Sequence, residues 1–381
     1  MSKVSLGEVA IEHKETCKGS KDGFPIVGLE HLVPEEVTLS AWDEGSDNTF
    51  TKMFRKGNVL FGRRRAYLKK AAVAPFDGIC SGDITVIEAI PDRILPELLP
   101  FIIQNDDLFD FAVGKSAGSL SPRVKWEHLK NYEFELPDME KQRELAQLLW
   151  AMDATKKSYQ KLIAATDELV KSQFIDMFGA PLSNEKGWPL KRIGELFSLI
   201  SRGKQPSYVD YSSVRVVNQA CIYWDRFNFE NVKYHDSQSG KKTLPVKKDC
   251  ILINSTGTGT LGRCNVFPEL TDAYVYVVDS HVTVLSGSSD VNAYFFKCFL
   301  HREDIQKKIY AECVNGSTNQ IELSKEKLSD VLLIVPPIEL QEQFAAFVRQ
   351  SDKSKFAVRN CSNLNLSGPL PIRISPVTPL P

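Results

Sequence analysis

The sequence predicts an α+β fold in which two similar strand-rich domains are separated by long helices. Residues 121–149 and 320–348 align with each other at one constant offset, and residues 139–178 contain neither proline nor glycine. Short β-branched and aromatic runs, punctuated by Gly, Pro and Asp, precede each aligned stretch. The repeat period far exceeds the roughly 20–50 residues of a solenoid unit. The duplicated unit is therefore a whole domain followed by a helix.

Identical residues fall in the same order in both copies. The matched pairs are Leu129 and Leu328, Pro137 and Pro336, Glu140 and Glu339, Gln142 and Gln341, Ala146 and Ala345, and Asp153 and Asp352. This repeat predicts pseudo-twofold symmetry within one chain. Such a molecule should engage a partner that itself has two halves.

The composition bounds the class of protein. The 381 residues leave room for two or three domains. Eight cysteines without a C-x-x-C pair, and six histidines without an H-x-x-x-H spacing, argue against a structural zinc site. We expect reduced thiols in a cytoplasmic protein. We find no cationic, apolar signal sequence at the N-terminus and no apolar run of roughly 20 residues. We therefore expect no membrane insertion.

The first predicted domain covers residues 1–137. Strands are expected at Phe24–Leu29, Val59–Phe61, Ala71–Ala74 and Asp83–Glu88, and short helices at Leu95–Gln104 and Leu108–Val113. Residues 138–180 then form a predicted spacer helix, with Asp138 as its N-cap and Gly179 and Pro181 as its stop.

The spacer helix carries a heptad-like seam that requires a partner helix. The predicted seam is Leu145, Leu148, Met152, Thr155, Tyr159, Leu162, Thr166 and Leu169. At about 1.5 Å per residue, 40 residues of helix reach about 60 Å.

The second predicted domain covers residues 181–336. Strands are expected at Val214–Asn218, Cys250–Asn254 and Val275–Leu285, and helices at Asn292–Leu300 and Asp304–Ala311. A second, shorter spacer helix is expected at residues 337–359, followed by a proline-rich tail, residues 360–381, that we expect to be disordered. This shortening would leave Val170, Phe174 and Met177 of the first helix partly unpaired.

Catalytic signatures are weak. Gly257–Gly262 fits G-x-G-x-x-G, but a β-prone stretch that ends at Pro268 follows it, where a dinucleotide site needs a helix. A nicotinamide-dependent enzyme is therefore the weaker alternative, and a polar turn is the simpler interpretation. The sequence contains no G-K-[ST] phosphate loop, no G-x-S-x-G and no nuclease-like carboxylate cluster. We predict no catalytic residue and no metal ligand in this chain.

Basic residues concentrate between Lys52 and Lys70, a stretch without Asp or Glu. Arg63, Arg64 and Arg65 directly follow a predicted strand, so a rigid scaffold would hold them. Guanidinium groups there could bind phosphates or the O6 and N7 edge of guanine, although most charge runs are simply solvated. Polar loops of both copies add further candidates. The predicted DNA-binding residues are Arg63, Arg64, Arg65, Tyr67, Lys69, Lys115, Ser116, Arg202, Lys204, Thr256, Thr258, Thr260, Asn315, Ser317, Thr318 and Asn319.

Several segments together resemble the specificity subunit of Type I restriction–modification systems, over residues 1–358. They are L-P-D-M-E-K-Q-R-E-L-A, V-P-P-I-E-L-Q-E-Q-F-A-A-F-V, F-I-D-M-F-G, W-P-L-K-R-I-G-E-L and G-S-T-N-Q-I. The C-terminus departs from the family pattern, because we expect the second helix to stop short of the length of the first.

The resemblance implies two target recognition domains, each reading half of a split sequence in double-stranded DNA, with the two helices as an antiparallel coiled-coil spacer. It implies methyltransferase subunits that use S-adenosylmethionine to methylate adenine, and endonuclease and translocase subunits that use ATP and Mg. This chain would bind no cofactor itself. The remaining alternative is a coiled-coil protein-interaction adaptor without DNA specificity, and salt-dependent DNA binding would separate the two.

Overall fold

The computed structural model of the protein describes residues 2–45, 48–118, 120–316 and 321–366, and the side chains of α10 as far as Ala357. The chain forms two compact units: the first comprises residues 1–159 together with those after 360, and the second comprises residues 160–360. They divide within helix α5 (Met139–Phe178), so each unit includes one part of this helix. Within the described ranges, no helix is long and apolar enough to cross a membrane.

The first unit is built on two small sheets and one separate pair of strands. β1 (Ser2–Ser5) pairs antiparallel with β9 (Glu133–Leu136) and so joins the two ends of the unit. The larger sheet has the order β2 (Ala10–Glu12), β8 (Ile84–Ala89), β5 (Val59–Gly62) and β6 (Ala71–Val73). The smaller sheet has the order β3 (Ile26–Val27), β7 (Gly78–Cys80) and β4 (Lys52–Phe54), with β3 and β7 parallel. The helices are α1 (Leu6–Val9), α2 (Leu99–Ile103), α3 (Asp106–Gly114) and α4 (Trp126–Leu129).

The second unit repeats this plan. β10 (Leu190–Arg192) pairs antiparallel with β22 (Leu332–Ile334). One sheet has the order β11 (Leu199–Arg202), β19 (Val282–Ser286), β16 (Ile251–Asn254) and β17 (Cys264–Val266). The other has the order β12 (Tyr208–Val209), β14 (Lys233–His235), β13 (Val214–Val217), β18 (Val275–Val278) and β15 (Leu244–Pro245). The remaining elements are α6 (Ile193–Leu196), α7 (Ala293–His301), α8 (Glu303–Glu312), the hairpin β20 (Val314–Asn315) and β21 (Glu322–Leu323), and α9 (Lys325–Asp330).

The two units share one topology. The sheet β2-β8-β5-β6 corresponds strand for strand to β11-β19-β16-β17, and every neighbouring pair in both is antiparallel. The parallel pair β3 and β7 corresponds to β13 and β18. Strands β12 and β14 extend this second sheet only in the second unit, as far as the described residues of the first unit go. The predicted domain duplication is therefore confirmed.

A buried glutamine performs the same task in both units. The side chain of Gln142 accepts a hydrogen bond from the Leu95 N–H (2.8 Å) and donates one to the Pro137 carbonyl (2.9 Å). Gln341 likewise accepts from the Asn292 N–H (2.9 Å) and donates to the Pro336 carbonyl (2.8 Å). Each amide thus ties the start of a spacer helix to the segment just before α2 in the first unit or α7 in the second. We call this pair the glutamine clamps.

The limits of α5 agree with the prediction. The Lys141 N–H donates to the Asp138 carboxylate (3.0 Å), as expected of an N-cap, and Gly179 has a φ of +75°, which favours glycine. The predicted seam is wrong in phase, because Leu148, Leu162 and Leu169 are 51%, 51% and 53% exposed.

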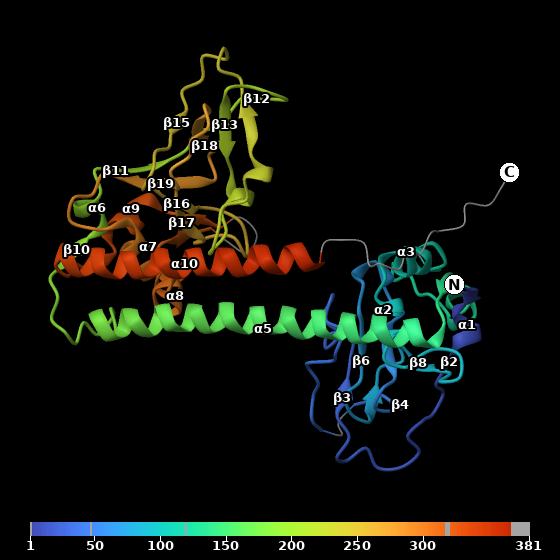
Figure 1. Ribbon diagram of the computed structural model, residues 1–381. Coiled ribbons are helices and arrows are strands. Elements are labelled where there is room, and N and C mark those ends of the chain that lie inside the picture. The colour runs from blue at the N-terminus through green and yellow to red at the C-terminus, as the bar shows by residue number, and fades with distance from the viewer. Residues whose placement is uncertain (1, 46–47, 119, 317–320, 367–381) are drawn as a thin grey trace. The chain divides into compact units, whose positions relative to one another are not determined.

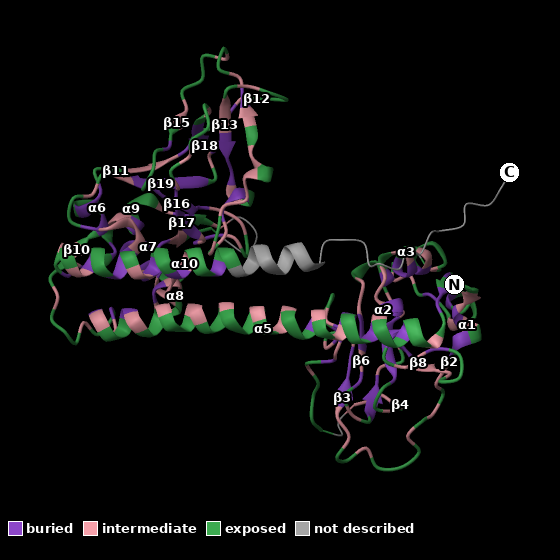
Figure 2. Cartoon of the chain, in the orientation of Figure 1, coloured by how far each residue is buried: buried purple, intermediate pink, exposed green. Residues whose placement is uncertain are grey.

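The buried side of α5 lies about one residue further along. At its N-terminal end it comprises Gln142, Ala146, Leu149 and Asp153, and at its C-terminal end Phe174 and Phe178. Two of these six side chains are polar, so an apolar heptad could not reveal this face. Between residues 154 and 173, all of which the structure describes, none is buried. Figure 2 shows the contrast between the helix ends and its middle. The ends of α5 are thus core elements of their units.

Phe174 belongs to an aromatic core of the second unit. Its ring lies 5.5 Å from that of Phe344 and 5.6 Å from that of Phe295, and Val170 and Met177 pack against the same cluster. The prediction that Val170, Phe174 and Met177 are left partly unpaired is therefore wrong. Within this unit the C-terminal half of α5 and helix α10 (Ile338–Leu366) run antiparallel (Figure 1), as the Phe174–Phe344 and Asp167–Lys355 contacts require.

Two other predicted boundaries need correction. Helix α10 continues to Leu366 rather than ending at residue 359, since the first glycine and proline are Gly368 and Pro369; it is still shorter than α5, with 29 residues against 40. Residues 367–381 lie outside the described residues. The expected strand Val275–Leu285 is two strands, β18 and β19, in different sheets. The Asp279 side chain accepts a hydrogen bond from the His281 N–H (2.9 Å) and makes the turn between them.

Candidate nucleic-acid interface

Three loops of the first unit meet at the end of β5. The Arg63 N–H donates to the Asp83 carbonyl (3.0 Å), and the Arg63 carbonyl accepts from the Val124 N–H (3.0 Å). The Arg65 N–H donates to the Pro122 carbonyl (2.8 Å). Backbone hydrogen bonds therefore join the loop after β5, the turn before β8 and the segment that follows α3. The sequence places these three segments far apart.

Two arginines share one carboxylate in this cluster. Arg123 donates from Nε to Asp83 Oδ1 (2.7 Å), and Arg64 Nη1 lies 3.3 Å from Asp83 Oδ2. Arg64 also donates to the Ser121 hydroxyl from Nε (3.2 Å) and Nη2 (3.0 Å). The hydrogen bond from Arg123, with help from Arg64, holds the pKa of Asp83 below its usual range. Asp83 is therefore ionised at neutral pH and orients both guanidinium groups.

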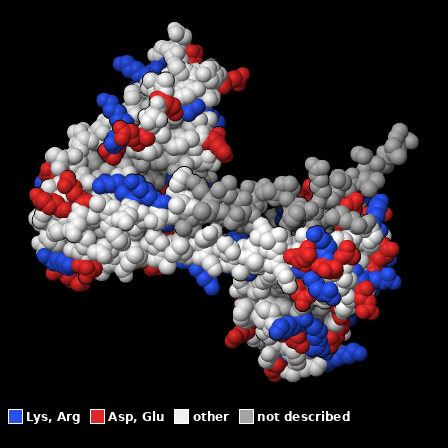
Figure 3. Space-filling model, in the orientation of Figure 1, with Lys and Arg blue, Asp and Glu red and all other residues white. Residues whose placement is uncertain are grey.

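Acidic residues from elsewhere in the fold neutralise much of the basic run. Lys52 pairs with Glu12 (3.6 Å), Arg55 with Glu15 and with Asp77 (2.9 Å), and Lys69 with Asp106 (2.5 Å). The side chain of Lys70 donates to the Leu29 carbonyl (2.7 Å). Figure 3 shows the same mixture of signs on the visible face of the first unit. The absence of acids within the run itself therefore overstates its positive charge.

The other predicted DNA-binding residues of the first unit differ in how exposed they are and in whether their side chains already have a partner. Within the described part of the chain, Arg63 and Arg65 form no ion pair, and Arg65 is exposed with a φ of +56°. Tyr67 is 55% exposed. Lys115 is exposed, with its ammonium 5.8 Å from the centre of the Phe111 ring. The Ser116 hydroxyl donates to the Ala112 carbonyl (2.8 Å) at the end of α3.

The second unit assembles the same cluster. The Ser255 N–H donates to the His281 carbonyl (2.8 Å), and the Ser255 carbonyl accepts from the Leu323 N–H (2.8 Å). These two bonds repeat those of Arg63. In the strand registers, Gly62 faces Ile84 and Asn254 faces Val282. Arg64 therefore corresponds to Thr256 and Asp83 to His281. Arg123 corresponds to Glu322, both by the repeat offset and by their bridges to Arg64 and to Thr256.

The corresponding side chains differ in chemistry. The Thr256 hydroxyl lies 2.9 Å from His281 Nδ1. Arg202 forms an ion pair with Glu322 and donates from Nε to the Ser280 carbonyl (2.5 Å). Lys204 is exposed and follows Gly203, where a Cβ atom would lie 2.1 Å from the Asp279 carbonyl oxygen. Only glycine allows this close approach of two backbones.

The glycine-rich segment is a closed turn. The Thr260 hydroxyl donates to the Thr256 carbonyl (2.9 Å), and the Leu261 N–H donates to the Gly257 carbonyl (3.0 Å). The turn leads directly into β17, so no helix begins where a dinucleotide site requires one. Thr258 is exposed at the tip of this turn.

The remaining predicted residues of the second unit follow α8. The Asn315 side chain accepts a hydrogen bond from Lys327 (2.7 Å). The predicted residues Ser317, Thr318 and Asn319 lie outside the described residues.

Sequence reasoning missed part of each cluster. In the first unit it missed Asp83, Ser121 and Arg123, and in the second His281 and Glu322. Arg123 and Glu322 occupy aligned positions of the repeat, so the alignment itself carried a signal for them. Asp83 and His281 are single residues before a strand, and nothing local distinguishes them. Among the residues that the structure describes, no group of His, Cys, Asp and Glu is placed to hold a metal ion.

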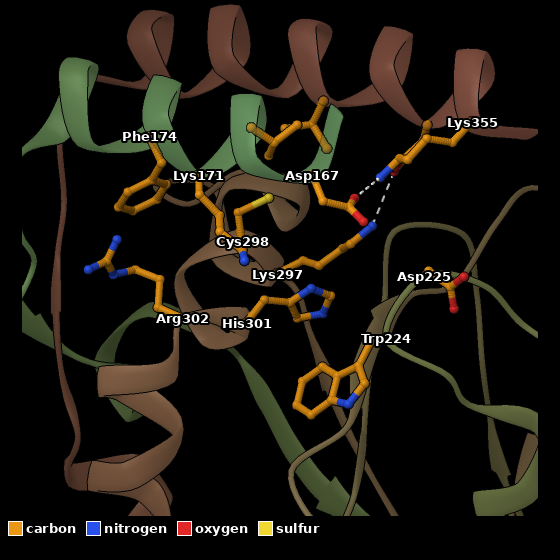
Figure 4. Close-up of a pocket in the computed structure, with 13 residues that line it drawn as sticks. Asp167, Lys171, Phe174, Trp224, Asp225, Lys297, Cys298, His301, Arg302 and Lys355 are labelled. Atoms are coloured by element: carbon orange, nitrogen blue, oxygen red, sulfur yellow. Dashed lines mark hydrogen bonds and ion pairs between the residues drawn. The ribbon is translucent and has the colours of Figure 1, made fainter. Parts of the chain in front are cut away.

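A separate cavity of about 370 Å³ lies in the second unit, between α5, α7, α10 and the loop at Trp224 (Figure 4). Its charges largely compensate one another: Lys355 pairs with Asp167 (2.7 Å) and Asp352 (2.8 Å), and Lys297 with Asp352 (3.2 Å). Burial would raise the pKa of Asp352, but Lys297 and Lys355 hold it below its ordinary value. We regard this ion-pair network as part of the packing of the unit.

The chain thus contains one α+β domain twice, and each copy presents the same loop cluster. This arrangement is typical of proteins that bind a target made of two parts. The family model of the Type I restriction modification DNA specificity domain matches residues 2–165 and again residues 185–365. The chain therefore belongs to this family.

Individual relatives agree. The chain is 26% identical over 333 residues to the specificity subunit of the Type I restriction enzyme MjaIX from Methanocaldococcus jannaschii, covering 78% of this chain and 71% of that one. It is 25% identical over 179 residues to the EcoDI specificity subunit from Escherichia coli, covering 46% of this chain and 36% of that one. Its fold is similar to a crystal structure of the Type I system S subunit from M. genitalium, with a TM-score of 0.58, 13% identity, and 96% and 92% of the two chains covered.

Proposed function

We propose that this chain is the DNA-sequence-recognition subunit of a Type I restriction–modification complex, and that the loop clusters of its two units contact the two parts of a bipartite site in duplex DNA. The repetition of the loop cluster carries this proposal. Both copies match the DNA specificity domain of the family. Two equivalent recognition surfaces in one chain suit a target that is itself in two parts.

The exposed polar side chains of the clusters suit contacts with the DNA backbone. Arg65 and Lys115 in the first unit, and Lys204 and Thr258 in the second, are all exposed. Lysine, arginine and hydroxyl side chains supply most protein contacts to phosphate oxygens. These contacts would give affinity and register. Ion-paired residues such as Arg55 and Lys69 would contribute less, because their charge is already compensated.

Catalysis belongs to partner subunits in this proposal. A methyltransferase would use S-adenosylmethionine to methylate adenine, and an endonuclease with translocase activity would use ATP and Mg. This chain would bind none of these cofactors. Its task is to select the site, and we expect it to act in the cytoplasm on cellular DNA.

Salt-dependent binding to duplex DNA tests the proposal. Log–log plots of affinity against salt fall with a slope of nearly one unit per bound phosphate. Replacing Arg63 and Arg65 together by Ala should flatten the slope by roughly one unit for each phosphate that the variant no longer binds. The matched control is Arg55→Ala, which removes a paired arginine of the same run and should leave the slope almost unchanged.

Methylation mapping tests the same proposal in cells. The full chain is expressed with a methyltransferase subunit that supports its assembly, and the methylated adenines are then located by single-molecule sequencing. We expect one motif in two separated parts. A chain that shows no salt-dependent binding to DNA and directs no methylation would contradict the proposal and would favour a protein-interaction adaptor.

A further inference from the structure

We propose that Arg123, oriented by Asp83, reads a guanine in the half-site bound by the first unit, and that Glu322 makes the second unit read cytosine at the corresponding position. This inference rests on the proposed function. It assigns base recognition to one pair of equivalent positions, outside the basic run.

The backbone around these two positions is the same in both units. Arg123 bridges to Arg64, and Glu322 bridges to Thr256. The residue that follows each one, Val124 or Leu323, donates its N–H to the loop that comes after β5 or β16. The two side chains therefore leave equivalent places on equivalent scaffolds. A difference between these two side chains therefore changes the chemistry of recognition without changing the backbone that carries them.

The geometry of Arg123 leaves a recognition edge available. Its Nε donates to Asp83 Oδ1 (2.7 Å) and its Nη2 lies 3.4 Å from Asp83 Oδ2, so one side of the guanidinium faces the carboxylate. At the opposite edge, formed by Nη1 and the second N–H of Nη2, the donors have no acceptor among the residues that the structure describes. Two such parallel donors match O6 and N7 of guanine. The side chain is 45% exposed, while Asp83 is only 19% exposed.

Asp83 is a positioning residue in this arrangement. It holds Arg123 on one carboxylate oxygen and Arg64 on the other, so it removes rotational freedom from the arginine before DNA arrives. A side chain that is already oriented loses less entropy on binding. Ser121 supports Arg64 from the other side.

Glu322 presents the opposite chemistry. One carboxylate oxygen, Oε1, pairs with Arg202, and the side chain is 52% exposed. Its other oxygen is an acceptor. A glutamate accepts from the N4 amino group of cytosine, which arginine cannot do. The first unit thus offers donors where the second offers an acceptor, and the two halves of the site should differ at this base.

The experiment selects duplexes from a randomised library with the full wild-type chain and with variants, and reads the preferred base at each position. Arg123→Lys keeps the positive charge but loses the two-donor edge. We expect its preference for guanine at one position of the first half-site to fall about tenfold or more, with the second half-site and the salt slope unchanged. Glu322→Gln should alter only the second half-site. Asp83→Asn should weaken the same guanine preference as Arg123→Lys.

Arg55→Lys is the matched control, since it makes the same substitution in an arginine of the first unit whose partners are Glu15 and Asp77. It should select the wild-type sequence. An Arg123→Lys chain that binds DNA and selects the wild-type sequence with full discrimination would overturn the inference while leaving the proposed function intact. A wild-type chain that selects no sequence would overturn the proposed function, and this inference with it. Thermal melts establish that each variant is folded.

Discussion

His301 and Gln104 make the same hydrogen bond in the two units. His301 Nε2 lies 2.9 Å from the Cys264 carbonyl, and Gln104 donates to the Ala71 carbonyl (2.6 Å). Cys264 and Ala71 begin the corresponding strands β17 and β6. Because a carbonyl only accepts, His301 must carry its proton on Nε2. Burial, with the nearby charge of Lys297, lowers the pKa of His301 to about 3.

This pKa makes the stability of the second unit acid-sensitive. Between about pH 6.5, the ordinary pKa of histidine, and pH 3, the unfolded chain binds a proton at residue 301 that the folded chain does not. Stability is therefore lost as the pH falls. His301→Gln copies the first unit and should remove this loss. Urea unfolding of wild type and variant measures it: the wild-type advantage should shrink by about 1.4 kcal/mol for each pH unit below 6.5. A constant difference would contradict the assignment.

Single residues were the hardest level to predict. The stretch Lys52–Lys70 contains no acid, yet Glu12, Asp77 and Asp106 fold against it from other parts of the chain. Ion pairs between distant segments leave no local pattern, so the candidate site was too positive and lacked Asp83 and Arg123. The exposed candidates Arg65 and Lys115 were found because loop position and residue type are local properties.

At the level of elements, α5 shows how a correct helix can have an incorrectly predicted face. Its limits followed from Asp138 and Gly179, which are local signals. Its buried side could not be predicted from local signals, because it includes the polar residues Gln142 and Asp153. Gln142 forms a hydrogen bond and Asp153 an ion pair there. The heptad rule assumes that burial is apolar. Helix α10 shows a related error: asparagine and serine are weak helix formers but do not end a helix as proline does.

The corrected face of α5 predicts unequal effects at neighbouring residues. Phe174 is 2% exposed within the aromatic cluster, and Ile175 is 40% exposed. Phe174→Ala should lower the free energy of unfolding by about 3–5 kcal/mol, and Ile175→Ala by less than about 0.5 kcal/mol. Chemical denaturation followed by circular dichroism compares them. Equal losses would contradict the assignment of Phe174, and not Ile175, to the buried side of α5.

For the whole molecule, the duplication was the most predictable feature. A constant offset over identities such as Pro137 with Pro336 requires the same local structure twice, whatever the details of either copy. Strand pairing was less accessible, because the short strands β3, β4 and β7 depend on partners far along the chain. The resemblance of the repeated segments to a known family supplied what periodicity alone could not.

The two units have separate hydrophobic cores, which predicts separable unfolding. Phe109 stacks on Phe61 in the core of the first unit (5.5 Å), and Phe174 lies in that of the second. Calorimetry should resolve two transitions. Phe109→Ala should lower the temperature of one of them and Phe174→Ala that of the other. A single transition that both variants shift equally would mean that α5 couples the units into one cooperative block.

The glutamine clamps and the backbone bonds of Arg63 and Ser255 have one more consequence. They join each unit through groups that do not depend on which side chains stand at positions 123 and 322. Point changes at those two places can therefore accumulate at little cost to folding. If positions 123 and 322 recognise bases as proposed, substitutions there would change the two halves of the target independently, and one duplicated scaffold would serve many different bipartite sites.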